Sequence, residues 1–176
     1  MKQILIAQVE DKPGVLNRVA SLFRRRNFNI ASLAVGHSET PGVSRMTIVT
    51  DEEEALRRNI VRANLYKMIN VIDVQDVTDT PCIVRETVLV KVSADAATRG
   101  SVMEIAEKYR ARVADVATKT LIVEITGEAE NIDAMVQELN PFNILEIMRT
   151  GSIAMTKGTV EAAAASTTEP ATNGNH

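Results

Sequence analysis

The first half of the chain changes twice between the two-residue period of a strand and the longer period of a helix. Residues 3–10 form a short, mostly apolar segment, which the turn-forming residues 11–14 interrupt. Asn27 tolerates a left-handed backbone better than most residues, so we expect the helix that follows to end there. The apolar stripe of this helix consists of Val15, Val19, Leu22 and Phe23.

Two more strands and a second helix complete this half in the order βαββαβ. Pro41 and Gly42 form a turn between the two strands. The acidic residues 51–54 are typical of a helix N-terminus. The expected elements are strands at residues 29–37 and 43–50, a helix with the apolar face Val61, Leu65 and Met68, and a strand at residues 71–77.

The same order of elements returns after a polar, helix-breaking segment at residues 79–81. The repeat is one of pattern, because the two halves do not share a residue sequence. The expected elements are a strand at residues 87–92, a helix with the stripe Val102, Ile105, Ala106 and Tyr109, strands at residues 112–117 and 120–126, a helix with the stripe Ile132, Met135, Val136 and Leu139, and a strand at residues 144–149.

This pattern predicts the α+β fold class, with two ferredoxin-like βαββαβ sandwiches. We expect a first domain at residues 1–78, a linker at 79–83 and a second domain at 84–157. The periodicity is lost from Gly151 onward. Residues 158–176 are rich in Ala, Ser, Thr and Asn and are predicted to form a disordered tail.

Composition and charge exclude several classes of function. The 176 residues carry a formal net charge of -3, whereas phosphate binding needs a concentrated basic surface. The basic residues 24–26 fall at the predicted end of the first helix, where cations complement the helix dipole; a protein contact is the alternative. The sequence shows no membrane span and no secretory pattern, and Cys82 is the only cysteine. We therefore expect a cytoplasmic protein without a nucleic-acid or membrane partner.

The residues that usually perform catalysis are scarce. The two histidines, His37 and His176, are far apart, and Cys82 has no histidine near it in the sequence. His37 is expected to be solvated or hydrogen-bonded. No residue spacing fits a metal site or a phosphate-binding loop, and the acids at residues 51–54 are better explained by a helix N-terminus than by a cation. We expect no catalytic residue, metal or cofactor in this chain, and an independent small enzyme is the weakest alternative.

The most informative segment connects the first strand to the first helix. Helix N-termini have N–H groups without partners, which favour an anion such as the carboxylate of a free amino acid. Gly14 lets the backbone approach a ligand, and Asp11 offers an anionic oxygen to an ammonium group. Val15 and Leu16 are expected to add apolar surface. The alternative is a tight turn without a ligand, which the residues of the turn alone favour.

Longer stretches of the chain resemble a known family. Residues 9–16, inside a βαββαβ unit, are similar to the ligand loop of an ACT domain. The resemblance to the small subunits of acetolactate synthase covers about residues 2–158. The segments that carry it are residues 18–23, 26–30, 32–33, 44–48, 84–86, 89–92 and 149–151.

This resemblance implies a homodimeric regulatory subunit in branched-chain amino acid biosynthesis. It would activate a separate large catalytic subunit, which carries thiamine diphosphate, Mg²⁺ and FAD, and it would confer feedback inhibition by valine. ACT domains of this family pair side by side, with effectors at the interface. The effector-binding residues that the resemblance implies are Asp11, Gly14, Val15 and Leu16 of one subunit and Asn29 and Ile30 of the other.

The chain departs from the family pattern in three places. Some members have Asn at the position of Asp11, many have Gly at the position of Asn27, and the Ala-rich tail has no counterpart. These departures concern the identity of the effector more than the family. The alternative function is an ACT-domain sensor that regulates a different enzyme or transcription. A DNA-binding version needs a basic helix-turn-helix, which this sequence lacks.

Overall fold

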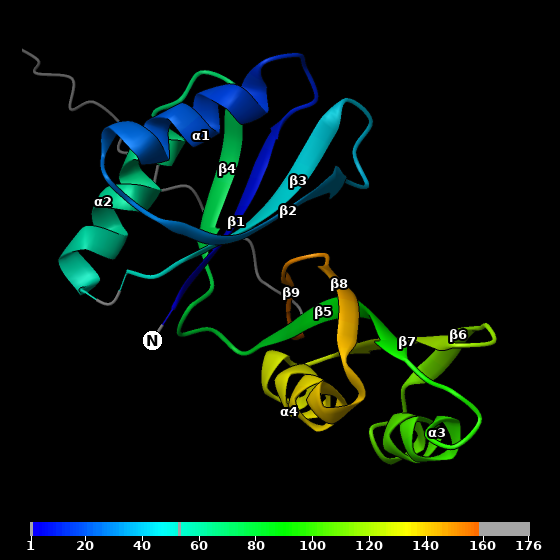
Figure 1. The fold of residues 1–176 in the computed structure, drawn as a ribbon. Coiled ribbons are helices and arrows are strands. Elements are labelled where there is room, and N and C mark those ends of the chain that lie inside the picture. Colours follow the sequence, from blue (N-terminus) through cyan, green and yellow to red (C-terminus); the bar gives the residue numbers. More distant parts are fainter. Residues whose placement is uncertain (1, 53, 159–176) are drawn as a thin grey trace, which may run out of the picture.

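The computed structural model describes residues 2–52 and 54–158. The first half forms an antiparallel sheet with the strand order β2-β3-β1-β4, and two helices cover one face of it (Figure 1). The left-handed Asn27, with a φ of 56°, follows the first helix as predicted. The elements of this half are β1 (Gln3–Glu10), α1 (Val15–Arg25), β2 (Ile30–His37), β3 (Val43–Thr50), α2 (Ala55–Tyr66) and β4 (Val71–Asp76).

The second half repeats this arrangement. Its sheet has the order β6-β7-β5-β8, and its two helices cover one face of it (Figure 1). The α+β fold class with two ferredoxin-like units is therefore confirmed. The elements are β5 (Cys82–Ser93), α3 (Arg99–Lys108), β6 (Arg112–Val116), β7 (Thr120–Gly127), α4 (Ala129–Leu139), the 3₁₀ helix η1 (Asn140–Phe142), β8 (Ile144–Arg149) and β9 (Ile153–Thr156).

Each half buries its own core between sheet and helices. The periodic residues predicted from the sequence supply most of both cores, because alternate strand residues and one stripe of each helix face the same interior. The core of the first half includes Leu5, Ala7, Val9, Val15, Val19, Phe23, Met46, Ile48, Val61, Leu65 and Val74. The core of the second includes Val88, Val90, Val92, Val102, Ala106, Leu121, Val123, Ile125, Ile132, Met135 and Leu139.

The strand pair β5–β9 differs from the prediction. The pattern predicts a strand that starts at residue 87, but β5 begins at Cys82, inside the predicted linker 79–83. The periodicity is lost after Gly151, but Ile153–Thr156 form the strand β9. The first four residues of β5 pair with β9, from Cys82 opposite Thr156 to Arg85 opposite Ile153. Each segment is a strand only because of a partner about seventy residues away, which local periodicity does not reveal.

The pair β5–β9 also joins the two domains. Ala154 of β9 is buried with Ile6 and Val77 of the first domain in a small third cluster. The guanidinium of Arg45 donates a hydrogen bond of 3.0 Å to the carbonyl oxygen of Ala154. The outer face of the first sheet is therefore partly covered by the last strand of the chain.

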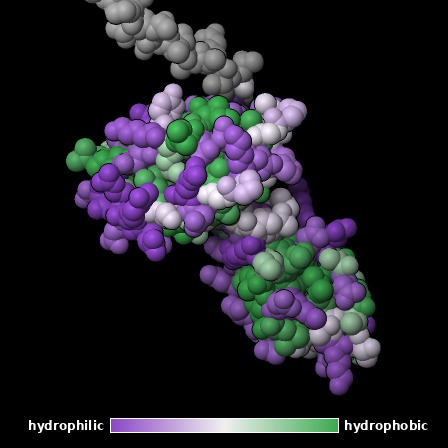
Figure 2. Space-filling view, turned by 90° about the horizontal axis from the view of Figure 1, so that it is seen from above, coloured by the Kyte–Doolittle hydropathy of each residue, from purple (hydrophilic) through white to green (hydrophobic). Residues whose placement is uncertain are grey.

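The surface differs between the two domains. Seen from above, the first domain presents mainly hydrophilic side chains, while apolar side chains gather on the second (Figure 2). Leu89, Ile147 and Met148 are among the exposed apolar residues of β5 and β8. Within the described residues, no helix is long and apolar enough to cross a membrane. All but the first residue of the predicted tail 158–176 lies outside the described part of the chain.

Candidate functional site

The connection from β1 to α1 is an open turn held by backbone hydrogen bonds. The N–H of Asp11 donates to the carbonyl oxygen of Gly42 at 2.8 Å, and the N–H of Val15 donates to that of Lys12 at 3.3 Å. Gly14 precedes the helix with a φ of 84°, in the left-handed region that favours glycine. A Cβ at Gly14 would meet nothing within 4 Å. The space in front of Gly14 is thus accessible to a ligand.

The first turn of α1 has no acid of its own. Its N-terminus has no side-chain cap and no acidic residue in the first turn. Among the described residues, the N–H groups of Leu16 and Asn17 have no hydrogen-bond acceptor. Such N–H groups, together with the helix dipole, favour an anion at this position.

The two apolar residues of the loop do not play the same role. Val15 is 3% exposed and packs into the core of the first domain, so its side chain is not available to a ligand. Leu16 is 46% exposed beside it. Of the two side chains expected to add apolar surface, that of Val15 is buried in the single chain, because the first position of the helix belongs to the buried stripe. Leu16 alone supplies accessible apolar surface.

Asp11 is accessible at the mouth of the loop. Its carboxylate lies 3.4 Å from the Nδ1 atom of His37, at the end of β2, and the side chains of Asp11 and His37 are 47% and 88% exposed. His37 is solvated, as predicted. The carboxylate of Asp11 makes no hydrogen bond within its own turn among the described residues, so it can accept one from an ammonium group.

The structure places Asn29 and Ile30 at the opposite end of the sheet. Ile30 lies opposite Thr50, which in turn lies opposite Gln3 at the start of β1. The loop begins after Glu10, at the other end of β1, about 23 Å away along a strand that rises roughly 3.3 Å per residue. Within one chain, therefore, the two groups of predicted site residues do not come together.

Asn29 is held in place by a residue that the sequence assigned to another role. The side-chain nitrogen of Asn29 donates to the carboxylate of Asp51 at 2.7 Å. As expected from the acids at residues 51–54, a helix starts directly after them: α2 begins at Ala55 with Glu54 at the N-cap position, although Glu54 makes no side-chain cap and the first turn holds no acid. Glu52 forms an ion pair of 2.9 Å with Arg57 instead. Ile30 is partly buried against the core of the first domain.

Asn70, in the turn between α2 and β4, forms hydrogen bonds with residues on both sides of the loop. Its side-chain nitrogen donates to the carboxylate of Glu10 at 2.6 Å, its carbonyl oxygen accepts from the N–H of Glu10, and its side-chain oxygen accepts from Arg18. The pKa of Glu10 is lowered, first by the hydrogen bond from Asn70 and then by Lys12. No sequence pattern singles out Asn70, because it meets the loop only through the tertiary fold.

Among the described residues, no group of three or more His, Cys, Asp or Glu side chains could hold a metal ion. A cleft of about 760 Å³ lies between the domains, and it is lined by residues of both. None of the predicted effector residues lines that cleft.

The fold and the open loop define a class of protein: an ACT domain followed by a second ferredoxin-like domain. Two family models match the chain, "AHAS small subunit-like ACT domain" over residues 5–73 and "Small subunit of acetolactate synthase" over residues 85–158. The chain belongs to the family of acetolactate synthase small subunits.

Individual relatives agree with this assignment. The acetolactate synthase small subunit of Mycolicibacterium smegmatis is 46% identical over 150 residues, which are 85% of this chain and 88% of that protein. That of Bacillus subtilis is 40% identical over 168 residues, or 96% and 98% of the two chains. The crystal structure of the small subunit from Thermotoga maritima superimposes with a TM-score of 0.82 at 34% identity and covers 91% of this chain and 99% of that one.

Proposed function

We propose that this chain activates the large catalytic subunit of acetolactate synthase and makes it sensitive to feedback inhibition by valine. The observation that carries the proposal is the open start of α1. Unpaired N–H groups, the accessible carboxylate of Asp11 and the exposed Leu16 lie within six residues of each other. These three groups complement the carboxylate, the ammonium group and the aliphatic side chain of valine.

A homodimer completes this site. β2 is an edge strand, paired on one side by β3. If two copies pair through β2 about a two-fold axis, the two strands run antiparallel and the start of one lies beside the end of the other. Asn29 and Ile30 of one copy are then brought to the end of the sheet where the partner copy has its 11–16 loop. The separation of these groups within one chain supports a site shared by two subunits.

Valine would act by stabilising one arrangement of the paired ACT domains. The carboxylate of valine would accept hydrogen bonds from the N–H groups of Leu16 and Asn17. Its ammonium group would donate a hydrogen bond to the carboxylate of Asp11. A ligand shifts an equilibrium only by its difference in affinity for the two arrangements. In this dimer the site lies at the interface between two subunits, so a change in how the subunits pair changes the site directly.

The catalytic subunit would supply the chemistry. We propose that it holds thiamine diphosphate, Mg²⁺ and FAD and converts pyruvate to acetolactate, and that this chain contributes no catalytic residue. The apolar area on the second domain, which includes Leu89 and Met148, is of the kind that subunit contacts use. We assign it to contacts within the dimer or with the catalytic subunit. The cytoplasm is the expected location of this assembly.

Reconstitution tests the proposal. The purified chain is added to its purified catalytic subunit with pyruvate and the three cofactors, with and without valine. We expect no turnover by this chain alone, higher activity of the catalytic subunit when the chain is present, and inhibition by valine only then. Turnover by the chain alone would contradict the regulatory role. Binding of valine without any effect on that catalytic subunit would favour an ACT-domain sensor of another enzyme or of transcription.

A further inference from the structure

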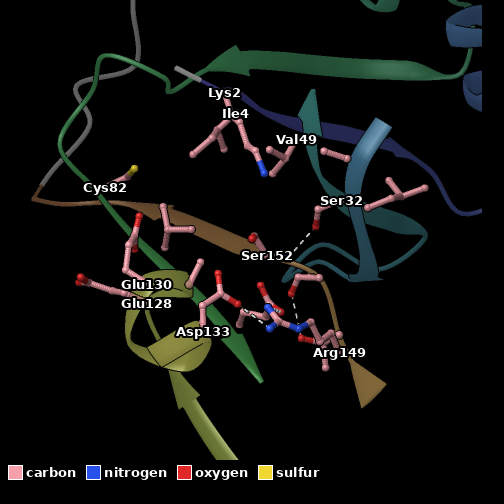
Figure 3. Close-up of a pocket in the computed structure, with 17 residues that line it drawn as sticks. Lys2, Ile4, Ser32, Val49, Cys82, Glu128, Glu130, Asp133, Arg149 and Ser152 are labelled. Atoms are coloured by element: carbon pink, nitrogen blue, oxygen red, sulfur yellow. Dashed lines mark hydrogen bonds and ion pairs between the residues drawn. The ribbon is translucent and has the colours of Figure 1, made fainter. Parts of the chain in front are cut away.

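The turn between β8 and β9, residues 150–152, fits closely against β2 of the first domain. The N–H of Ser152 donates a hydrogen bond of 2.8 Å to the hydroxyl oxygen of Ser32, and Figure 3 shows these two residues facing each other at the interdomain cleft. Gly151 has a φ of 79°, and a Cβ at this position would lie 2.7 Å from the Ser32 hydroxyl oxygen. This contact requires a glycine both for its backbone conformation and for its size.

The remaining contact between the domains is small. The cluster between them has the buried residues Ile6, Val77 and Ala154, and Ala154 is also hydrogen-bonded to Arg45 and Thr47. Three more apolar residues are partly buried against this cluster, whereas each domain core contains many more residues. The cleft of about 760 Å³ opens beside the turn. Small interfaces beside open space allow domains to move relative to one another. The position of the second domain therefore depends strongly on a few contacts. One of these contacts joins the 150–152 turn to Ser32, which lies on β2, the edge strand of the first domain.

The same turn is fixed firmly to the second domain. Thr150 and Thr87 of β5 exchange two hydrogen bonds of 3.1 Å, N–H to carbonyl oxygen and N–H to hydroxyl oxygen. The guanidinium of the preceding Arg149 lies 3.2 Å from the carboxylate of Glu86 and 2.5 Å from that of Asp133 on α4. A displacement of the turn is thus carried to both the sheet and a helix of the second domain.

We propose that the contact between Ser32 and the 150–152 turn couples effector binding in the first domain to the position of the second domain. Ser32 follows Asn29 and Ile30 at the start of β2, so the strand that meets the effector also meets the turn. This inference rests on the proposed function, which places valine beside Asn29 and Ile30. It assigns a regulatory role to residues 150–152, which do not touch the effector. Without the contact, valine still binds, but the second domain no longer responds to it.

Two single variants test this coupling in the full chain, reconstituted with its catalytic subunit. Ser32→Ala removes the acceptor of the Ser152 N–H, and Gly151→Ala introduces a Cβ against the Ser32 hydroxyl. For both we expect activation and the valine-induced rise in melting temperature to persist. The valine concentration for half-inhibition should rise at least tenfold, about the size of a lost coupling free energy between two sites.

Two further variants serve as controls. Gly158→Ala has the same left-handed strain, with a φ of 75°, but no atom lies within 4 Å of its Cβ, so its valine inhibition should match the wild type. In Ser32→Ala/Gly151→Ala the hydroxyl that opposes the new Cβ is absent. Adding Gly151→Ala to Ser32→Ala should therefore change inhibition much less than adding it to the wild type.

The outcomes separate this inference from the proposed function. If valine does not inhibit the wild-type assembly, both fail. If the wild type is inhibited and both Ser32→Ala and Gly151→Ala are inhibited at the same valine concentration, only the coupling is overturned. It is also overturned if Ser32→Ala loses the valine-induced thermal shift together with inhibition, because Ser32 then belongs to the effector site itself.

Discussion

The two domains connect their first strand to their first helix in different ways, although they share one fold. In the second domain, the carboxylate of Asp95 accepts hydrogen bonds from the N–H of Ala97 at 3.0 Å and from the N–H and hydroxyl of Thr98, both at 2.9 Å. These bonds lower the pKa of Asp95, with the Thr98 N–H as the largest cause. In the first domain, Asp11 makes no such bonds, and Gly14 takes the position before the helix.

Asp95 is a structural aspartate, whereas the carboxylate of Asp11 is accessible. Asp95 closes its own turn, and its oxygens are already satisfied by the chain. Asp11 faces solvent beside His37 and can accept a hydrogen bond without breaking another. A βαββαβ unit therefore does not by itself predict ligand binding. In the function proposed above, the chemistry of this one connection decides which domain holds the effector.

The largest effect is expected from a carboxylate introduced at the N-terminus of α1 in the first domain. Gly14→Asp places a negative charge where the carboxylate of valine should sit, so we expect complete loss of valine inhibition and of the valine-induced thermal shift. Activation of the catalytic subunit should survive.

Gly14→Asn is the matched control for this variant. Asn has the shape of Asp without the charge and tolerates the left-handed backbone at this position. We expect it to keep a measurable valine response. If Gly14→Asp responds to valine like the wild type, the loop is only a turn and the effector site lies elsewhere.

Replacing the two aspartates in turn tests whether they differ in function. Asp11→Ala removes the acceptor for the ammonium group, and we expect valine to bind about 10- to 150-fold more weakly, as for a hydrogen bond to a charged group worth roughly 1.5–3 kcal/mol. Isothermal titration calorimetry would measure this. Asp95→Ala is the counterpart and should leave valine affinity unchanged. Equal losses of affinity in both variants would show that the two aspartates do not differ in function.

Asn29→Ala tests the contribution of the other subunit. One hydrogen-bonding group is lost, so we expect valine to bind more weakly by roughly 1–3 kcal/mol. Asp51→Ala should have a smaller effect of the same sign, because it only releases Asn29 from its 2.7 Å hydrogen bond. Titration of the full chain with valine measures both variants. An unchanged affinity in Asn29→Ala would exclude this end of β2 from the site.

The smallest expected effect is the pH dependence of the closed turn. Because the pKa of Asp95 is lowered below its ordinary 3.8 in the folded state, its carboxylate stabilises the fold above that pH. This contribution is lost as the pH falls through the lowered value. Asp95→Asn should therefore reduce the melting temperature near pH 7, and the gap from the wild type should narrow below about pH 4. A gap that stays constant over this range would mean that the charge of Asp95 is not responsible.

The sequence predicted most of the fold because its signal was local. The bounds of β1, β3 and β8 match the predicted strands. β1 and β3 bury an apolar face against the helix layer, whereas β8 is exposed along most of its length. The pair formed by residues 82–85 and 153–156 was missed, because these segments pack between domains and depend on each other across the chain. Periodicity reports which face of a segment is buried, and it carries no information on distant pairing.

For the candidate site, the sequence located the loop but not its surroundings. The turn residues place Asp11 and Gly14 before the first helix, but on their own they favour a plain turn, and the effector role of these residues comes from the family resemblance. The surroundings of the loop arise where separate elements meet. Examples are the burial of Val15 and the hydrogen bonds that join Asn70 to Glu10 and Asn29 to Asp51. Such contacts follow from the packing of helices on the sheet, which no window of the sequence contains.

The cover that β9 provides for the first sheet also sets an order of events during synthesis. Ile6 and Val77 are buried with Ala154, so the first domain emerges from the ribosome about eighty residues before its outer face can be closed. At roughly 5–20 residues per second, a nascent chain exposes this apolar strip for about 4–16 s. During that interval the protein is most open to misassembly with neighbouring chains or to capture by a chaperone.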